Sequence, residues 1–279
     1  MAEKQVIFIT GANTGIGYEV VKSLCKTSKA YDILLGSRSV EKGEDAAAKL
    51  SKEVPETAST ISVVQIDVTS DESTQKAVDY IKSKHGKLDV LINNAGGSFD
   101  RELQAGRVTM REAFNKSWDL NISGAQVLTS LSMPLLLKSS DARLMFVTSG
   151  TSSLTESDNF EHPALARINA SPAAGWPKDE SLNPITAYRS SKTGLNMLMR
   201  EWYRLLKNDG VKVWAISPGF LATGLGGIGA DVLKSVSWSC HVSTLHLLTC
   251  RRSELGIPLK AESSSRMSLK ASVITIKAR

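Results

Sequence analysis

The sequence has no long hydrophobic run and few cysteines, and both shortages restrict what the protein can be. The first apolar run, residues 6–9, is far shorter than the core of a signal peptide, and no later run approaches the ~20 residues of a membrane span. Its only cysteines, Cys25, Cys240 and Cys250, show no metal-ligand spacing, and an odd number fits a reducing compartment better than a disulfide framework. We therefore expect a soluble, cytoplasmic protein with no membrane association and no metal.

The chain also lacks internal repeats, and its charge is uneven. A length of 279 residues with 42% hydrophobic content suits one ordinary globular domain. Residues 1–231 contain 26 basic and 26 acidic side chains, whereas residues 232–279 contain eight basic and two acidic ones. The basic segment has neither interleaved aromatic residues nor a heptad pattern, so we expect no nucleic-acid partner.

Short β-branched runs alternate with longer segments in which apolar residues recur at intervals of three and four. This alternation predicts an α/β fold, a doubly wound parallel sheet of Rossmann type with six or seven strands and helices on both faces. The expected strands are residues 5–10, 31–37, 61–67, 88–93, 143–149 and 211–217. The expected helices are residues 15–29, 41–53, 71–86, 109–138 and 186–209.

The turn after the first expected strand reads TGANTGIG, from Thr10 to Gly17. A glycine-rich turn between a strand and a helix is where a dinucleotide pyrophosphate binds to backbone N–H groups. Gly11, Gly15 and Gly17 leave room for that approach. Glycine is common in all turns, so the motif gains its weight from the strand before it and the helix after it.

The end of the second expected strand bears on the choice of cofactor. A carboxylate there would bind the ribose 2′-hydroxyl of NAD, but the sequence has Ser37 and Arg38. A guanidinium can clamp a 2′-phosphate, so NADP is favoured over NAD. The alternative is that Arg38 is simply a solvated residue at the start of a loop.

Four of the five tyrosines have a lysine four residues later: Tyr18/Lys22, Tyr80/Lys84, Tyr188/Lys192 and Tyr203/Lys207. Such spacing alone selects none of them, because helical neighbours touch whether or not they catalyse. Position does select one. Ligands of a doubly wound sheet bind at the carboxyl ends of its strands, and Tyr188 opens a helix at that edge, after a strand that ends in Ser149. The Lys192 ammonium and a nearby positive nicotinamide ring are together expected to lower the pKa of the Tyr188 phenol.

Seven motifs follow one another in an order that resembles the short-chain dehydrogenase/reductase superfamily. They are TGANTGIG (10–17), IDV (66–68), NNAG (93–96), LNISG (120–124), VTSG (147–150), YRSSK (188–192) and SPGFLATGL (217–225). The resemblance covers residues 5 to about 230 and is closest to fungal NADP-dependent carbonyl and ketoreductase members, including some that act on polyketides and other secondary metabolites. It implies a domain over residues 1–235.

The resemblance implies a role for each of four residues. Ser149 would hydrogen-bond the substrate oxygen, Tyr188 would donate the proton, Lys192 would tune Tyr188, and Asn121 would hold a water of a proton relay beside Lys192. Taken alone, Asn121 would be a helix-capping amide.

The resemblance also implies a set of cofactor contacts. Two of these have ordinary structural alternatives: Asp67 could cap a strand end, and the NNAG segment could be a tight turn. The implied contacts are the diphosphate with Gly11, Asn13, Gly15, Ile16 and Gly17; the adenine with Asp67 and Val68; the riboses with Asn94, Ala95, Gly96, Tyr188 and Lys192; and the carboxamide with Pro218, Gly219, Leu221 and Thr223.

The sequence departs from the family pattern in two places. Ser149 and Tyr188 lie 39 residues apart, which implies an inserted loop at about residues 150–186. Carbonyl reductases of the superfamily have a similar insertion, and some are monomers, so the oligomeric state stays open. In this loop Phe160, His162 and Trp176 either line the substrate entrance or pack over a helix.

Residues 236–279 are the second departure, since they match none of the family's motifs and suggest an alternative C-terminus. Residues 272–277 could still add an edge strand. The sequence thus predicts an NADP-dependent oxidoreductase for a small carbonyl or alcohol. The alternatives are a catalytically silent NADP-binding protein whose substrate pocket is disrupted and, less favoured, an epimerase or dehydratase on the same fold.

Overall fold

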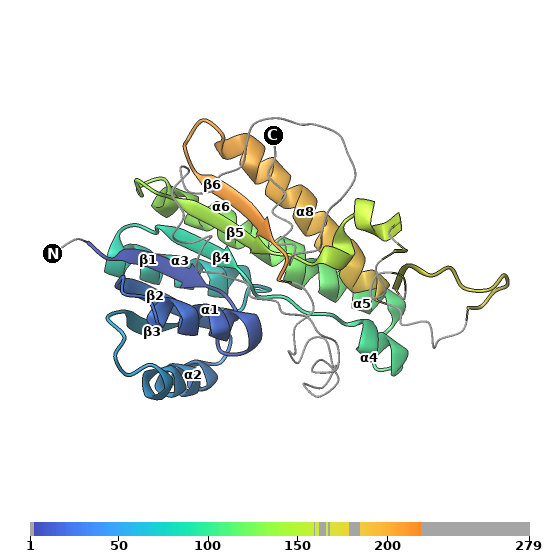
Figure 1. The fold of residues 1–279 in the computed structure, drawn as a ribbon, viewed down its shortest axis with the longest axis horizontal. Coiled ribbons are helices and arrows are strands. Elements are labelled where there is room, and N and C mark those ends of the chain that lie inside the picture. The colour runs from blue at the N-terminus through green and yellow to red at the C-terminus, as the bar shows by residue number, and fades with distance from the viewer. Residues whose placement is uncertain (1–2, 159, 162–165, 167, 179–184, 219–279) are drawn as a thin grey trace.

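The computed structural model describes residues 3–158, 160–161, 166, 168–178 and 185–218, and they form one six-stranded parallel sheet with order β3-β2-β1-β4-β5-β6 (Figure 1). All six expected strands and the doubly wound α/β class are confirmed. The strands are β1 (Gln5–Ile9), β2 (Tyr31–Ser37), β3 (Thr60–Gln65), β4 (Val90–Asn93), β5 (Arg143–Val147) and β6 (Lys212–Ile216). The chain adds strands outward from β1 to β3 and then returns to add β4 beside β1, so the sheet has its switch point between β1 and β4.

Helices cover both faces of this sheet. The helices are α1 (Gly15–Cys25), α2 (Val40–Glu53), α3 (Asp71–His85), α4 (Asp100–Gln104), α5 (Met110–Trp118), α6 (Gly124–Leu136) and α8 (Thr186–Leu206). On one face α1 and α2 pack against side chains such as Ile7 and Ile33. On the other face α3, α6 and α8 pack against Phe8 and Phe146. Because successive residues of a strand point to opposite faces, β1 is apolar on both sides.

The expected single helix over residues 109–138 is wrong in one respect. A π-helical turn, η1 (Asp119–Ser123), lies between α5 and α6, and the Gly124 amide bonds to the Asp119 carbonyl five residues back. A π-turn inserts one residue into a helix without disturbing the apolar pattern on either side, so periodicity could not show it. The short helix α4 was also not predicted.

Several expectations fall outside the described residues. These are the seventh strand at 272–277, the whole of the atypical segment 236–279 and the cysteines Cys240 and Cys250. Within the described part of the chain, Cys25 is buried and burial raises the pKa of its thiol. No helix there is both long enough and apolar enough to cross a membrane.

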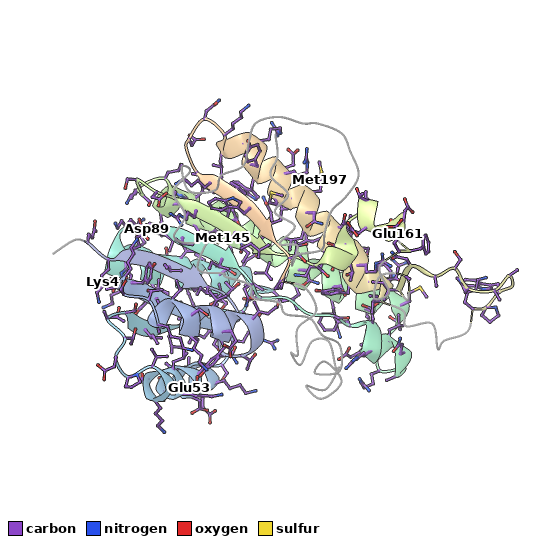
Figure 2. The ribbon with its side chains drawn as sticks, in the orientation of Figure 1. Lys4, Glu53, Asp89, Met145, Glu161 and Met197 are labelled. Carbon is purple, nitrogen blue, oxygen red and sulfur yellow. The ribbon has the colours of Figure 1, made fainter. Side chains whose placement is uncertain are left out.

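The amino-terminal edge of the sheet is closed by Asp89, which precedes β4 and is 4% exposed. Its carboxylate accepts hydrogen bonds from the Val6 amide at 2.8 Å and from the Ser139 hydroxyl at 2.5 Å. The Lys87 ammonium lies 3.5 Å away. One buried side chain thus joins β1 to the segment after α6, at the end of the sheet near Lys4 (Figure 2).

Replacing Asp89 with Asn should lower the free energy of unfolding by about 1–3 kcal/mol, because one accepting oxygen becomes a donor that faces another donor. Denaturant titration measures this change. The matched control is Asp79→Asn on the exposed side of α3, where the loss should stay within about 0.5 kcal/mol. Equal midpoints for the two variants would contradict the assignment of Asp89 as a structural anchor.

Candidate active site

The glycine-rich turn between β1 and α1 has the shape expected of a phosphate cradle. Gly11 and Gly15 have positive φ angles of 61° and 57°, which favour glycine. A Cβ atom on Gly17 would lie 2.6 Å from the Asn94 side-chain nitrogen and 2.7 Å from the Gly11 carbonyl oxygen. Thr14 begins α1 without a side-chain cap, so the first N–H groups of the helix are left for another acceptor.

The NNAG segment supports this turn from the neighbouring strand. The Asn94 side-chain amide donates to the carbonyls of Thr10 at 2.8 Å and Gly11 at 3.1 Å. In return the Thr10 hydroxyl accepts from the backbone amides of Asn94 at 3.1 Å and Ala95 at 2.9 Å. Thr10 was not among the predicted site residues, yet it fixes the distance between the two turns. The side chain of Asn94 binds protein backbone, which leaves its predicted ribose contact untested.

Five other predicted contact residues lie around the same edge. Arg38 is exposed between β2 and α2, and the buried Ser37 hydroxyl bonds to the Ser39 carbonyl at 2.8 Å. One oxygen of the Asp67 carboxylate accepts from the amide and hydroxyl of Thr69, at 3.0 and 2.7 Å, which is the capping alternative named for it. Val68 is buried under Gly124, while Asn13 and Ile16 are half-buried in the first turn.

The four predicted catalytic residues come from separate elements but converge at the carboxyl ends of β4 and β5. Asn121 lies in the π-turn, Ser149 follows β5, and Tyr188 and Lys192 lie in the first two turns of α8. Gly96 marks the point where two of them meet. A Cβ atom there would lie 2.8 Å from the Asn121 side-chain oxygen and 3.0 Å from the Lys192 ammonium. Gly96 is therefore required by close approach rather than by backbone angle.

Asn121 ties the β4 loop to α8. Its side-chain oxygen accepts from the Gly97 amide at 3.0 Å. Its side-chain nitrogen donates to the Gly97 carbonyl and to the Ser191 hydroxyl, each at 2.9 Å. All three bonds are made by a residue that is 1% exposed. The Asn121 side chain therefore sets the spacing of two segments that flank Lys192.

Lys192 is a buried cation held beside the tyrosine. Its ammonium donates to the Val147 carbonyl at 2.9 Å and lies 5.9 Å from the centroid of the Tyr188 ring. Removal from water penalises its charged form and lowers the pKa of Lys192 to about 8. A lysine that titrates near neutral pH is suited to proton transfer.

The expectation that Lys192 lowers the pKa of Tyr188 is not met in this structure. Burial raises the pKa of the phenol, and only a hydrogen bond with Ser149 acts in the opposite direction. The physical reason is that the Lys192 ammonium bonds to the Val147 carbonyl and is itself desolvated. Tyr188 is consequently a neutral phenol near pH 7, the state in which it can give up a proton.

The other three tyrosine–lysine pairs have different surroundings. The Tyr18 hydroxyl donates to the Glu53 carboxylate at 2.9 Å, and burial together with Glu53 raises the pKa of Tyr18 to about 12. Lys22 also binds Glu53, at the end of α2 (Figure 2). Tyr80 is exposed on α3, and Tyr203 packs partly against the core. Of the four tyrosines, only Tyr188 has a hydrogen bond with the serine after β5.

A polar network that the sequence analysis missed aligns β5 with α8. The Thr148 hydroxyl donates to the Asn196 side chain at 2.6 Å, and Asn196 donates to the Ser152 hydroxyl at 3.0 Å. The Thr193 hydroxyl donates to the Ser152 carbonyl at 2.8 Å. Ser152 ends the short helix η2 (Gly150–Ser152), whose first turn is capped by Ser149. Ser149 and Tyr188 therefore stay adjacent although an insertion separates them in sequence.

The described part of the insertion is attached to α8 by Arg189. Its guanidinium donates to the Thr151 carbonyl at 2.8 Å, the Ile168 carbonyl at 3.2 Å and the Asn169 side chain at 2.9 Å. Phe160 and Trp176 are 56% and 87% exposed. Trp176 therefore does not pack over a helix, which removes that alternative for this residue.

Some predicted site residues lie outside the described part of the chain. They are His162, Gly219, Leu221 and Thr223, whereas Pro218 is described and follows β6. Among the described residues, no three His, Cys, Asp or Glu side chains are grouped as a metal site.

Comparison with known proteins agrees with this arrangement. The family model for short chain dehydrogenases matches residues 5–159. The chain is 46% identical over 226 residues to the short-chain dehydrogenase/reductase tropE of Talaromyces stipitatus, covering 81% of this chain and 82% of that protein. It is 48% identical over 226 residues to the short-chain dehydrogenase/reductase eupG of a Phoma species, covering 80% and 79%.

The fold is also found among solved structures. The NADPH-bound carbonyl reductase from chicken fatty liver superposes with a TM-score of 0.62 and 22% identity, covering 82% of this chain and 84% of that one. At this identity the likeness concerns the fold alone. The fungal relatives and the family match go further, and together with the converging motifs they show that this chain belongs to the short-chain dehydrogenase/reductase family.

Proposed function

We propose that the protein is an NADP-dependent oxidoreductase that interconverts a small carbonyl compound and its alcohol, in the secondary metabolism of a fungus. The observation that carries the proposal is the meeting of Ser149, Tyr188 and Lys192 at the carboxyl ends of β4 and β5, beside a turn shaped for a pyrophosphate. The family's members are oxidoreductases that use nicotinamide cofactors on small molecules, and the 2′-phosphate preference and the substrate class are our additions.

The residues present fit such a cofactor. Gly11 and Gly17 leave a backbone cradle that a Cβ atom would fill, and the uncapped start of α1 offers N–H donors to a diphosphate. The exposed guanidinium of Arg38 would pair with a 2′-phosphate. Lys192 would hold the ribose beside the nicotinamide, and Pro218 to Thr223 would contact its carboxamide. When bound, the cofactor supplies or accepts the hydride.

The residues of this chain supply the proton. In the reductive direction Ser149 and Tyr188 donate hydrogen bonds to the carbonyl oxygen, and the neutral Tyr188 phenol gives its proton to that oxygen as the carbon becomes an alcohol. The phenolate that forms lies beside the Lys192 ammonium, whose pKa burial lowers to about 8. The phenol then regains its proton through Lys192 from a water near Asn121, the relay that the family resemblance implies.

Turnover tests the proposal directly. The full chain is mixed with NADPH and a panel of ketones and aldehydes, and NADPH absorbance is followed with time. Oxidation of NADPH that depends on one of the carbonyl compounds would support the proposal. Binding of NADPH without turnover on any of them would favour a catalytically silent protein. Conversion of a substrate with no net change in the amount of NADPH, by a protein that does not release the cofactor, would favour an epimerase or dehydratase.

Tyr188→Phe should reduce kcat by at least ~10²-fold, because the ring stays in place while the proton donor is lost. Stopped-flow kinetics with NADPH in excess would measure the chemical step. Tyr18→Phe is the matched control, since it also removes one phenol hydroxyl from a tyrosine–lysine pair and should leave kcat nearly unchanged. Near-normal turnover of Tyr188→Phe across pH 6 to 9 would show that another group provides the proton.

Arg38→Ala should weaken NADPH binding by about 10- to 150-fold, because a charge-assisted bond contributes roughly 1.5–3 kcal/mol. NADH binding should change little, since NADH has no 2′-phosphate. Cofactor fluorescence titration gives both dissociation constants. Arg204→Ala, which removes an exposed arginine from the last turn of α8, should affect neither. Equal weakening for both cofactors would contradict the NADP assignment.

Lys192→Met should abolish turnover and yet raise the free energy of unfolding at pH 7 by about 1–2 kcal/mol. The variant no longer buries a charged group, and each unit of the lowered Lys192 pKa corresponds to about 1.36 kcal/mol of that penalty. The lost hydrogen bond to Val147 offsets part of this gain. The pKa of Lys192 falls from 10.5 in the unfolded chain to about 8, so the penalty is fully present below pH 8 and is relieved as pH rises toward 10.5. Denaturant titrations at pH 7 and 9.5 should therefore show wild-type stability rising relative to the variant. Lys207→Met is the surface control. A variant less stable at pH 7 would contradict this account.

A further inference from the structure

Among the described residues, α8 begins without a cap from the residue at its own N-cap position. The residue before its first turn is Ile185, whose side chain has no hydrogen-bonding atom, and no side-chain cap forms there. An α-helix ordinarily begins with Ser, Thr, Asp or Asn at this place, because their oxygen accepts from the second or third amide of the helix. In α8 those amides belong to Ala187 and Tyr188.

A carboxylate far away in the sequence takes over this role. Oδ1 of Asp100 accepts from the Ala187 amide at 2.9 Å, and Oδ2 accepts from the Tyr188 amide at 3.0 Å. Oδ2 also accepts from the Ser98 hydroxyl at 2.9 Å. Asp100 is 3% exposed, so these bonds form away from water. It opens α4, which lies against the first turn of α8 (Figure 1).

We propose that Asp100 is a positioning residue for the reaction, which caps α8 from α4 and thereby fixes the backbone of Tyr188. The carboxylate bonds to the amide of the residue that carries the phenol, so a change in these bonds moves Cα of Tyr188 directly. A negative charge at the first turn also offsets the positive end of the helix dipole. This inference rests on the proposed function for its catalytic consequence but not for the cap itself.

A second feature strengthens the assignment. The first two turns of α8 are bonded to three other segments: Ser191 to Asn121, Lys192 to Val147, and Arg189 to Thr151. These contacts are made by side chains of α8. Only Asp100 bonds to the backbone of Tyr188 from outside the helix among the described residues. Loss of the other contacts would loosen one side of the helix, whereas loss of Asp100 releases the end from which the phenol projects.

The test compares Asp100→Ala and the milder Asp100→Asn with a rescue, Asp100→Ala combined with Ile185→Asp, which supplies a cap at the usual position. Asp89→Asn is the matched control, because Asp89 is also a buried aspartate that accepts from a backbone amide and a serine hydroxyl, but at the opposite edge of the sheet. Amide hydrogen exchange of residues 186–192 is measured in all variants, together with kcat and the dissociation constant of NADPH.

Asp100→Ala should speed exchange of the Ala187 and Tyr188 amides at least ~10-fold and lower kcat at least ~10-fold, with NADPH affinity within about twofold of wild type. Asp100→Asn should show smaller changes of the same kind. The rescue should restore slow exchange and at least part of kcat. The Asp89→Asn control should change neither quantity in α8.

Unchanged exchange in Asp100→Ala, or the same exchange pattern in Asp89→Asn, would overturn the proposal. If the Ile185→Asp rescue restores slow exchange but does not restore kcat, the catalytic part of the proposal is overturned. Exchange is measured without turnover. If exchange changes in Asp100→Ala as expected but the wild-type protein has no activity, the cap is confirmed and the proposed function is refuted.

Discussion

The position of one tyrosine depends on polar bonds that cross from α8 to the rest of the fold. Burial of apolar side chains attaches the length of α8 to the sheet, but a helix packed only by apolar contacts can slide or rotate at low cost. Around Tyr188 directional bonds remove that freedom. Asp100 binds its amide, Lys192 reaches the end of β5, and Asn121 holds the next turn through Ser191. These groups are buried, so breaking any of the bonds leaves a polar atom without water to replace its partner.

The same residues determine how protons can move. Burial that fixes Lys192 also lowers its pKa, and burial that encloses Tyr188 raises the pKa of its phenol. The order of the two pKa values is thus reversed from that of a free lysine and a free tyrosine, since the ammonium becomes the more acidic partner. A Tyr188 phenolate would therefore take a proton from the Lys192 ammonium in the favourable direction. This order results from desolvation and not from direct contact of the two charges.

The strands could be predicted from local pattern, and the meeting of Ser149 with Tyr188 from the rule that ligands bind at the carboxyl ends of parallel strands. The place of Asn121 beside them was implied by the family resemblance alone. The sequence did not predict Asp100 or the Thr148–Asn196 pair, since nothing near Asp100 in the sequence indicates that Tyr188, 88 residues later, will lack a cap. Sequence reasoning also did not show that Lys192 leaves the pKa of Tyr188 unlowered in this structure. Lysine at the fourth position gives proximity, but the orientation of its ammonium depends on a strand carbonyl at Val147.

The π-turn that carries Asn121 restricts the number of residues between α5 and α6. Each residue of an α-helix advances the chain by about 100°, so an extra residue between α5 and α6 rotates one helix against the other by that angle. Both helices have buried faces on either side of the turn, with Ala113 in α5 and Leu128 in α6. Removing a single residue from 119–123 would keep one of these faces inward and turn the other toward solvent. The number of residues in this segment is therefore fixed by the buried faces on both of its sides, in addition to the bonds of Asn121 within it.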